Sequence, residues 1–202
     1  MSLGRIVPQP VLGAQAQLTW SEGAMTPAGL AAVCAEVAGR RRDRRVVECG
    51  SGFSTLVLAR VLRARAGRLV SLEHDRAWAT RVQSELAAAG LAEIARVALA
   101  PLEPHPLALN GLHWYAQHAL PSHPPGIDLL LVDGPPAFEP HIELSRYPAL
   151  PALAERLAPD ATVILDDIDR PGELRILETW ERDCDFRFEV RPAQRIAIGH
   201  RS

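Results

Sequence analysis

The sequence predicts a doubly wound α/β sheet of seven strands, mostly parallel, that ends in a C-terminal antiparallel pair of strands. Short apolar runs alternate along the chain with longer segments whose apolar residues recur at helical spacing. Such alternation is typical of strands and helices that follow one another around a parallel sheet. The run Ile127–Val132 is almost wholly apolar, as expected of a central strand that is covered on both faces.

The length and composition predict one globular domain. At 202 residues the chain has the usual size of a single domain, and we expect an irregular arm over residues 1–25 and one domain over residues 26–202. The apolar fraction of 48% and the charged fraction of 23% are ordinary for a globular protein. The net charge is only −2, and no apolar run approaches the roughly 20 residues of a membrane span. We therefore expect neither a nucleic-acid nor a membrane partner.

The cysteines indicate a reducing compartment. Cys34, Cys49 and Cys184 are odd in number and far apart, so they fit neither a zinc spacing nor a disulfide framework. The first residues lack the apolar stretch of a secretory leader. We expect a cytoplasmic protein. Every basic residue is an arginine, so no lysine is available as a catalytic base.

Five helices are predicted from apolar residues at helical spacing and from signals at the helix ends. Thr26 can cap the first helix and Pro27 suits its first turn. Gly39 and Gly90 are typical of residues that follow a helix. The predicted helices cover residues 26–39, 54–65, 76–89, 148–157 and 171–183.

The apolar runs between these helices predict the strands. The predicted strands cover residues 45–49, 68–72, 94–99, 127–132, 161–165, 186–190 and 195–199. Residues 101–125 form a long connection rich in Pro and His, in which we expect one helical turn near Trp114. Trp114 and Tyr115 either form an apolar wall for a substrate or anchor this connection. Ligands of doubly wound sheets bind at the carboxyl ends of the strands, so the segments that follow the strands are candidate binding segments.

The first of these segments is a glycine turn between a strand and a helix. Gly50 and Gly52 let a ligand approach the backbone closely, and the following helix presents free amides. A dinucleotide site would have a third glycine where Thr55 stands, which weakens that interpretation. Glu48, two residues before the first glycine, suits a ligand with a cationic amino-acid end. A tight turn without any ligand remains an alternative.

The second segment ends in an acidic residue. Glu73 follows the second strand, about 20 residues after the glycines, where an acid accepts hydrogen bonds from ribose hydroxyls. A helix cap is the alternative role for such an acid, but Asp75 already serves as the cap before Arg76. Glu73 is therefore predicted to bind a ribose.

Acidic residues also follow two of the later strands. Asp133 ends an apolar strand and must meet water, a ligand or a metal, although Asp-Gly also forms turns. Asp166 and Asp167 are adjacent at another strand end and repel each other unless a cation relieves them. Together the three could supply oxygen ligands to Mg²⁺. In the alternative, Asp167 or Asp169 caps the next helix and Arg170 neutralises the remaining charge.

These motifs together resemble the class I S-adenosylmethionine-dependent methyltransferases, and most closely the small-molecule group called methyltransferase family 24. The resemblance runs from about Trp20 to the C-terminus and implies a Rossmann-like methyltransferase sheet. The stretches that carry it are Glu48–Thr55, Ser71–Asp75, Asp133–Pro136, Arg146–Leu150 and Leu165–Arg170, with Glu173 and Trp180.

The resemblance implies S-adenosylmethionine as cofactor and assigns it a site. The methionine part would lie against Gly50 and Gly52, with the turn residues Ser51, Phe53 and Ser54. Glu48 would orient the amino group, directly or through the loop. Glu73 would bind the ribose and His74 would flank the adenine. Asp133 would lie near the methionine end or the reacting methyl group.

A related group, the metal-dependent catechol-type O-methyltransferases, differs from this chain at two points. Where that group has an Asp-Asn pair, this chain has Asp166 and Asp167, and it lacks the lysine that the group uses as a base. A divalent ion, with Mg²⁺ as the candidate, would be held by Asp133, Asp166 and Asp167. Without a metal a general base is needed, and His141 in the loop after Asp133 is the candidate.

We therefore expect a methyltransferase that acts on a small molecule, at an oxygen atom. The alternatives are an NAD(P)-dependent oxidoreductase and a module that binds S-adenosylmethionine without turnover. A homodimer is compatible with the sequence. The arginine-rich run from Arg40 to Arg45 contains no aromatic residues, and we expect it to be a solvated loop rather than a nucleic-acid site.

Overall fold

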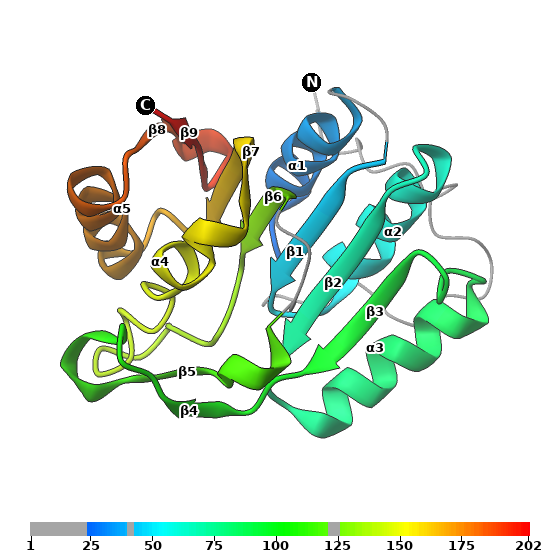
Figure 1. Ribbon diagram of the computed structural model, residues 1–202, viewed down its shortest axis with the longest axis horizontal. Helices are drawn as coiled ribbons and strands as arrows, with labels where there is room; N and C mark the ends of the chain where they lie inside the picture. Colours follow the sequence, from blue (N-terminus) through cyan, green and yellow to red (C-terminus); the bar gives the residue numbers. More distant parts are fainter. Residues whose placement is uncertain (1–23, 40–42, 121–125) are drawn as a thin grey trace, which may run out of the picture.

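One sheet of seven strands organises the molecule, in the order β3-β2-β1-β6-β7-β9-β8 (Figure 1). The computed structural model describes residues 24–39, 43–120 and 126–202. Most of the arm expected over residues 1–25, and Arg40, Arg41 and Arg42 of the arginine-rich run, lie outside these ranges. The sheet strands are β1 (Arg45–Cys49), β2 (Arg68–Glu73), β3 (Ala95–Leu99), β6 (Ile127–Val132), β7 (Leu157–Asp166), β8 (Phe186–Arg191) and β9 (Ile196–Arg201).

The sheet has the predicted mixture of strand directions. Strands β3, β2, β1, β6 and β7 are parallel neighbours. Strand β9 pairs antiparallel with β7, and β8 pairs antiparallel with β9. The strand order reverses between β1 and β6, which places the ends of these two strands side by side. The prediction of a mostly parallel, doubly wound sheet of seven strands with a C-terminal antiparallel pair is confirmed.

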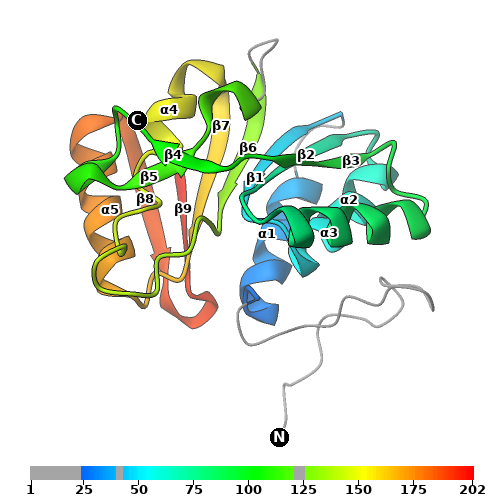
Figure 2. The same ribbon diagram turned by 90° about the horizontal axis from the view of Figure 1, so that it is seen from below.

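Helices cover both faces of the sheet. Helices α1, α2 and α3 pack together on one face of β1, β2 and β3, as Figure 2 shows. Helices α4 and α5, with the connection after β3, build a second apolar cluster on the other face. The helices are α1 (Pro27–Gly39), α2 (Phe53–Ala64), α3 (Arg76–Ala88), α4 (Ala149–Leu153) and α5 (Pro171–Asp183).

Helix α4 is shorter than predicted and the strand after it is longer. The helix expected over residues 148–157 ends at Leu153 and tightens into a 3₁₀ turn, η4 (Ala154–Arg156). Strand β7 already begins at Leu157, where it pairs with Ile127. Pro159 favours an extended conformation at Ala158, within the early part of β7.

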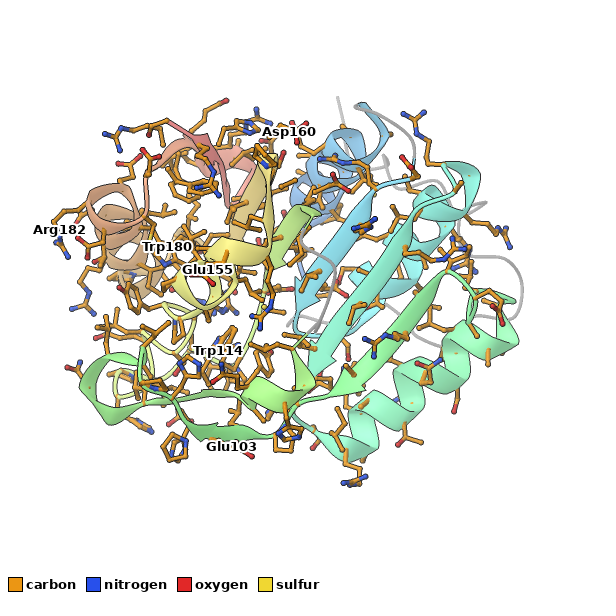
Figure 3. The ribbon with its side chains drawn as sticks, viewed as in Figure 1. Glu103, Trp114, Glu155, Asp160, Trp180 and Arg182 are labelled. Atoms are coloured by element: carbon orange, nitrogen blue, oxygen red, sulfur yellow. The ribbon has the colours of Figure 1, made fainter. Side chains whose placement is uncertain are left out.

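The connection after β3 contains a small hairpin in place of the expected helical turn at Trp114. Strand β4 (Leu102–Pro104) pairs antiparallel with β5 (His113–Tyr115). The 3₁₀ turns η2 (Leu109–Gly111) and η3 (Gln117–Ala119) flank β5. Figure 3 shows Trp114 on the inner side of this hairpin, whereas Glu103 points away from the domain. Trp114 is fully buried in the second apolar cluster, so it anchors the connection.

Arg44 is not solvated, contrary to the expectation for the arginine-rich run. Only 2% of its surface is exposed. Its guanidinium donates hydrogen bonds to the backbone oxygens of Glu36 (2.5 Å) and Asp128 (3.0 Å). Arg44 therefore joins α1 to β6. The guanidinium satisfies backbone acceptors there, which makes its burial tolerable.

The three cysteines are free thiols. Burial raises the pKa of Cys34 to about 11 and that of Cys49 above its usual range, so both are inert thiols rather than reactive thiolates. Within the described ranges, every helix is too short or too polar to cross a bilayer.

Candidate active site

A cavity of about 330 Å³ opens where the carboxyl ends of β1, β2 and β6 meet. Its volume lies within the range typical of small-molecule sites. The glycine turn after β1, the acidic end of β2 and the loop after β6 all contribute to its wall. The lining includes the predicted cofactor residues Gly50, Ser51, Gly52, Phe53, Ser54, Glu73, His74 and Asp133.

The two glycines of the turn have different roles. Gly50 has a φ of +91°, and a Cβ atom there would lie 2.8 Å from the backbone oxygen of Asp133. Gly50 therefore lets the loops after β1 and β6 touch. Gly52 has an extended φ of 172°, and its Cβ would meet only the ring of Trp78, at 4.0 Å. Neither backbone conformation nor packing requires a glycine at position 52, so a close ligand explains it best.

Glu48 holds the glycine turn in place through hydrogen bonds. It is fully buried and accepts hydrogen bonds from the hydroxyls of Ser54 (2.5 Å) and Thr55 (2.6 Å). The Thr55 hydroxyl also accepts the backbone N–H of Gly52, at 2.9 Å. Burial raises the pKa of Glu48 to about 7, although the hydroxyls of Ser54, Thr55 and Ser71 lower it. Glu48 does not line the cavity, so of its two predicted modes of action only the one through the loop is available.

Glu73 is a buried acidic residue in the lining of the cavity. Its carboxylate accepts the backbone N–H groups of Ser51 (3.1 Å) and Asp75 (2.9 Å). It also accepts the Ser51 hydroxyl (2.9 Å) and faces Nδ1 of His74 at 2.9 Å. Burial would raise the pKa of Glu73, but these hydrogen bonds outweigh it and lower the pKa. Glu73 therefore stays ionised at neutral pH, as a strong hydrogen-bond acceptor.

The cap of α3 is formed by Asp75, as predicted. Its Oδ1 accepts the backbone N–H of Trp78 at 2.7 Å. The indole N–H of Trp78 in turn donates to the backbone oxygen of Ser51 at 2.7 Å. The indole bond ties α3 to the glycine turn. Because Asp75 fills the cap, Glu73 has no capping role.

The three acids that follow β6 and β7 do come together. Oxygen atoms of Asp133, Asp166 and Asp167 lie within 4.8 Å of one another. The Asp133 side chain is 15% exposed and lines the cavity. Burial raises the pKa of Asp133 well above its usual range, the charge of Asp166 raises it further, and Arg146 opposes this. Burial and the charge of Asp167 raise the pKa of Asp166 to about 6.

A buried arginine sits among these acids, and its role was missed by sequence reasoning. Arg146 is 4% exposed, and its Nη1 lies 3.1 Å from Oδ2 of Asp167. Its Nη2 lies 3.5 Å from Oδ1 of Asp133. The resemblance contained Arg146 within Arg146–Leu150 but gave it no role, because its partners are remote in the sequence. Arg170 also pairs with Asp167, at 2.8 Å. This pair agrees with the alternative to a metal site, in which Arg170 neutralises the acidic charge.

The donor set does not fit a divalent metal. Both oxygens of Asp167 are occupied, Oδ1 by Arg195 (2.8 Å) and Oδ2 by Arg146 and Arg170. Asp133 shares the guanidinium of Arg146. Oδ1 of Asp166 is buried without a hydrogen-bond partner in the described part of the chain, but Arg146 also donates to the backbone oxygen of Asp166, at 3.4 Å. Mg²⁺ and Ca²⁺ bind oxygen ligands at about 2.0–2.6 Å, and an ion at that distance from both Asp133 and Asp167 would lie against the guanidinium of Arg146.

His141, the predicted general base, lies outside the cavity. Its side chain is 74% exposed, and Nδ1 lies 3.5 Å from Oε2 of the exposed Glu139. It does not belong to the lining. An exposed side chain outside the lining is not placed to take a proton from an acceptor in the cavity, so the structure does not support His141 as the base.

Tyr115 also lines the cavity, and the sequence left open whether it forms a substrate wall or anchors the connection. Its ring is fully buried, yet it belongs to the cavity wall. Its hydroxyl has no hydrogen-bond partner within the described residues. A Cβ atom at Gly134 would lie 2.6 Å from this hydroxyl, which places the hydroxyl beside the loop after β6. A buried hydroxyl without a partner indicates a place for a ligand acceptor atom.

Solved structures of similar fold include three proteins relevant to this site. The cofactor-bound Rv0187 from MTB is 21% identical, with a TM-score of 0.68 over 96% of this chain and 91% of that one. The O-methyltransferase TomG from Streptomyces achromogenes is 19% identical, with a TM-score of 0.60 over 92% of this chain and 92% of that one. The O-methyltransferase from Bacillus cereus is 19% identical, with a TM-score of 0.62 over 90% of this chain and 84% of that one. These likenesses confirm the fold, whereas a comparison with curated protein sequences gives no significant match.

The family follows from the sequence itself. Residues 47–168 match the model of methyltransferase family 24, described as a methyltransferase domain. The match covers more than half of the 202 residues and contains the glycine turn, Glu73 and Asp133. It decides against the NAD(P)-dependent oxidoreductase. The chain belongs to this family and is a class I S-adenosylmethionine-dependent methyltransferase.

Proposed function

We propose that this enzyme transfers the methyl group of S-adenosylmethionine to an oxygen atom of a small molecule. The observation that carries the proposal is Asp133, a carboxylate on the cavity wall whose pKa is raised by burial and by Asp166. A raised pKa makes this carboxylate a stronger proton acceptor than an ordinary aspartate. Two proteins of similar fold, TomG and the protein from Bacillus cereus, are O-methyltransferases, which supports oxygen as the acceptor atom.

In this proposal the cofactor extends from Glu73 to Asp133 across the glycine turn. Glu73 accepts the ribose hydroxyls, which take the places of the Ser51 hydroxyl and the His74 ring, while the two backbone N–H bonds stay. The open space beside Gly52 admits the methionine part. When bound, the cofactor supplies an activated methyl group on sulfonium, so the protein has mainly to position the reactants.

Asp133 takes the proton of the acceptor. As the new carbon–oxygen bond forms and the carbon–sulfur bond breaks, the acceptor hydroxyl loses its proton to the Asp133 carboxylate. Arg146 opposes the effect of burial on the pKa of Asp133 and so favours the ionised carboxylate, which is the form that accepts the proton. No step of this route uses a metal ion.

The acceptor itself is proposed from the remaining lining. Met25, Pro135, Pro136 and Phe138 form an apolar part of the cavity wall. The Phe138 side chain is exposed, as expected of a surface that is covered only when an acceptor binds. A small hydroxylated molecule with an apolar or aromatic body fits this wall. The expected absence of nucleic-acid and membrane partners, the cytoplasmic location and a homodimer remain predictions.

The test is a transfer assay with methyl-labelled S-adenosylmethionine. We expect label in O-methyl products from a panel of hydroxylated small molecules, and little label in amines, thiols or RNA. In Asp133→Asn, affinity for S-adenosylhomocysteine should stay within about threefold while turnover falls by about a hundredfold or more, as expected when a general base is lost. Label that appears only in RNA or amines would reject oxygen transfer. Unchanged turnover in the variant would remove Asp133 as the base, and a complete lack of product would favour the binding module without turnover.

A further inference from the structure

We propose that the guanidinium of Arg146 is the resident cation of the acidic cluster, defined as Asp133, Asp166, Asp167 and Glu173, and that methyl transfer needs no divalent ion there. The inference deepens the proposed function, on which its catalytic part rests. Its structural part, that the cluster is closed to metal ions, stands on geometry alone.

Arg146 uses each of its three guanidinium nitrogens. Nε donates to the backbone oxygen of Pro135 at 3.1 Å, and Nη2 to the backbone oxygen of Asp133 at 3.3 Å. Nη1 donates to Oδ2 of Asp167 at 3.1 Å and lies 3.5 Å from Oε1 of Glu173. One cation therefore joins the loop after β6, the end of β7 and the start of α5. Bonds from this planar fork fix both its position and its orientation.

Asp167 has no place left for a metal. Its two oxygens contact three guanidinium groups, those of Arg146, Arg170 and Arg195, at 2.8–3.1 Å. A divalent ion bound to either oxygen would lie in contact with at least one permanent positive charge. Arginine does not lose its proton in proteins, so this repulsion persists at every working pH. A metal could enter only if at least one arginine moved away.

Asp166 does not provide an alternative ligand set. Its Oδ1 lacks a hydrogen-bond partner among the described residues, but its acidic neighbours Asp133 and Asp167 both contact Arg146. An ion bound to Asp166 and to either of these neighbours would lie beside the permanent positive charge of Arg146. The deeply buried Arg146 thus occupies the centre where a divalent ion would lie.

The place of Arg146 assigns it a positioning role. It contacts the backbone oxygen and the carboxylate of Asp133 at once, which holds this residue at the cavity wall. A metal in this position would bind the acceptor oxygen directly. Arg146 is committed to protein groups, so it orients Asp133, and Asp133 contacts the acceptor.

The test measures Mn²⁺ binding and activity separately. Mn²⁺ is titrated into the whole protein without acceptor and followed by electron paramagnetic resonance and calorimetry. We expect no saturable site below about 1 mM in the wild type, and unchanged turnover after treatment with EDTA. A saturable Mn²⁺ site that Asp166→Asn or Asp167→Asn abolishes would overturn the inference. A site that both variants leave intact lies outside the cluster, and it supports the closed cluster if turnover also survives EDTA.

Removing the guanidinium of Arg146 should open the acidic cluster to a metal ion. Arg146→Gln leaves the acids without their central charge, so it should gain an Mn²⁺ site at least tenfold tighter than any in the wild type. Arg182→Gln, which removes an exposed ion pair with Asp183, is the matched control and should gain none. If Arg146→Gln does not fold, the titrations of the wild type, Asp166→Asn and Asp167→Asn still decide. Because these titrations need no acceptor, they decide even if the proposed oxygen transfer fails.

Discussion

At the scale of single residues, one glycine of the turn is needed for folding and the other for ligand binding. Gly50 combines a positive φ with a contact that a methyl group would break, so Gly50→Ala should cost about 1–3 kcal/mol of unfolding free energy. Gly52 has neither restriction, so Gly52→Ala should unfold like the wild type but bind S-adenosylhomocysteine at least tenfold more weakly. Chemical denaturation and calorimetry measure both. Equal affinity in Gly52→Ala and wild type would place the ligand elsewhere.

Glu73 should contribute to cofactor affinity through its charge. Glu73→Gln keeps the shape but weakens the acceptor, and hydrogen bonds to charged groups contribute about 1.5–3 kcal/mol. We expect S-adenosylhomocysteine to bind at least tenfold more weakly, measured by isothermal titration. The exposed Glu103 on β4 offers the control Glu103→Gln, which should bind normally. If both variants bind like the wild type, Glu73 has no part in the site.

At the scale of elements, the β4–β5 hairpin brings the Tyr115 hydroxyl to the cavity. Tyr115→Phe removes only that hydroxyl, which lacks a protein partner in the described structure. We expect unchanged or higher thermal stability, and a twofold to tenfold loss of S-adenosylhomocysteine affinity, the value of one neutral hydrogen bond at about 0.5–1.5 kcal/mol.

The neighbouring Trp114 provides the contrast. It is buried but does not belong to the cavity lining, so Trp114→Phe should lower stability and leave affinity unchanged. An affinity loss in Trp114→Phe as large as that in Tyr115→Phe would mean that the hairpin acts only by packing.

The elements that could be predicted are those with a regular pattern. Strands such as Ile127–Val132 are apolar because both faces are covered, and that property is visible in one sequence. The hairpin could not be predicted, because β4 and β5 have three residues each and pair across a connection with no period. Candidate residues such as Glu73 and Asp133 were found because parallel strands end at one edge. Arg146 was not, because its partners lie on three remote segments.

At the scale of the whole molecule, burial of Glu48 links stability to pH. Its pKa is about 7 in the folded protein, above the usual 4.5. The folded state therefore retains a proton that the unfolded state has lost between these values. The stability from this group is complete below pH 4.5 and disappears as the pH rises to 7.

Glu48→Gln should remove this dependence on pH. Its unfolding free energy, relative to that of the wild type, should rise between pH 5 and pH 8 by on the order of 2 kcal/mol. Denaturant titrations at a series of pH values measure this difference. The exposed Glu93 supplies the control Glu93→Gln, for which the difference should stay constant. A constant difference for Glu48→Gln as well would show that Glu48 is ionised in the folded state.

In the proposed complex, one cavity holds the cofactor between Glu73 and Asp133. A crystal structure with bound S-adenosylhomocysteine is the decisive test of this arrangement. We predict ribose hydroxyls within hydrogen-bonding distance of the Glu73 carboxylate, the methionine part against Gly52, and the sulfur atom facing the side of the cavity where Asp133 lies. A nucleoside bound away from Glu73, or a sulfur atom separated from Asp133 by protein, would rule this arrangement out.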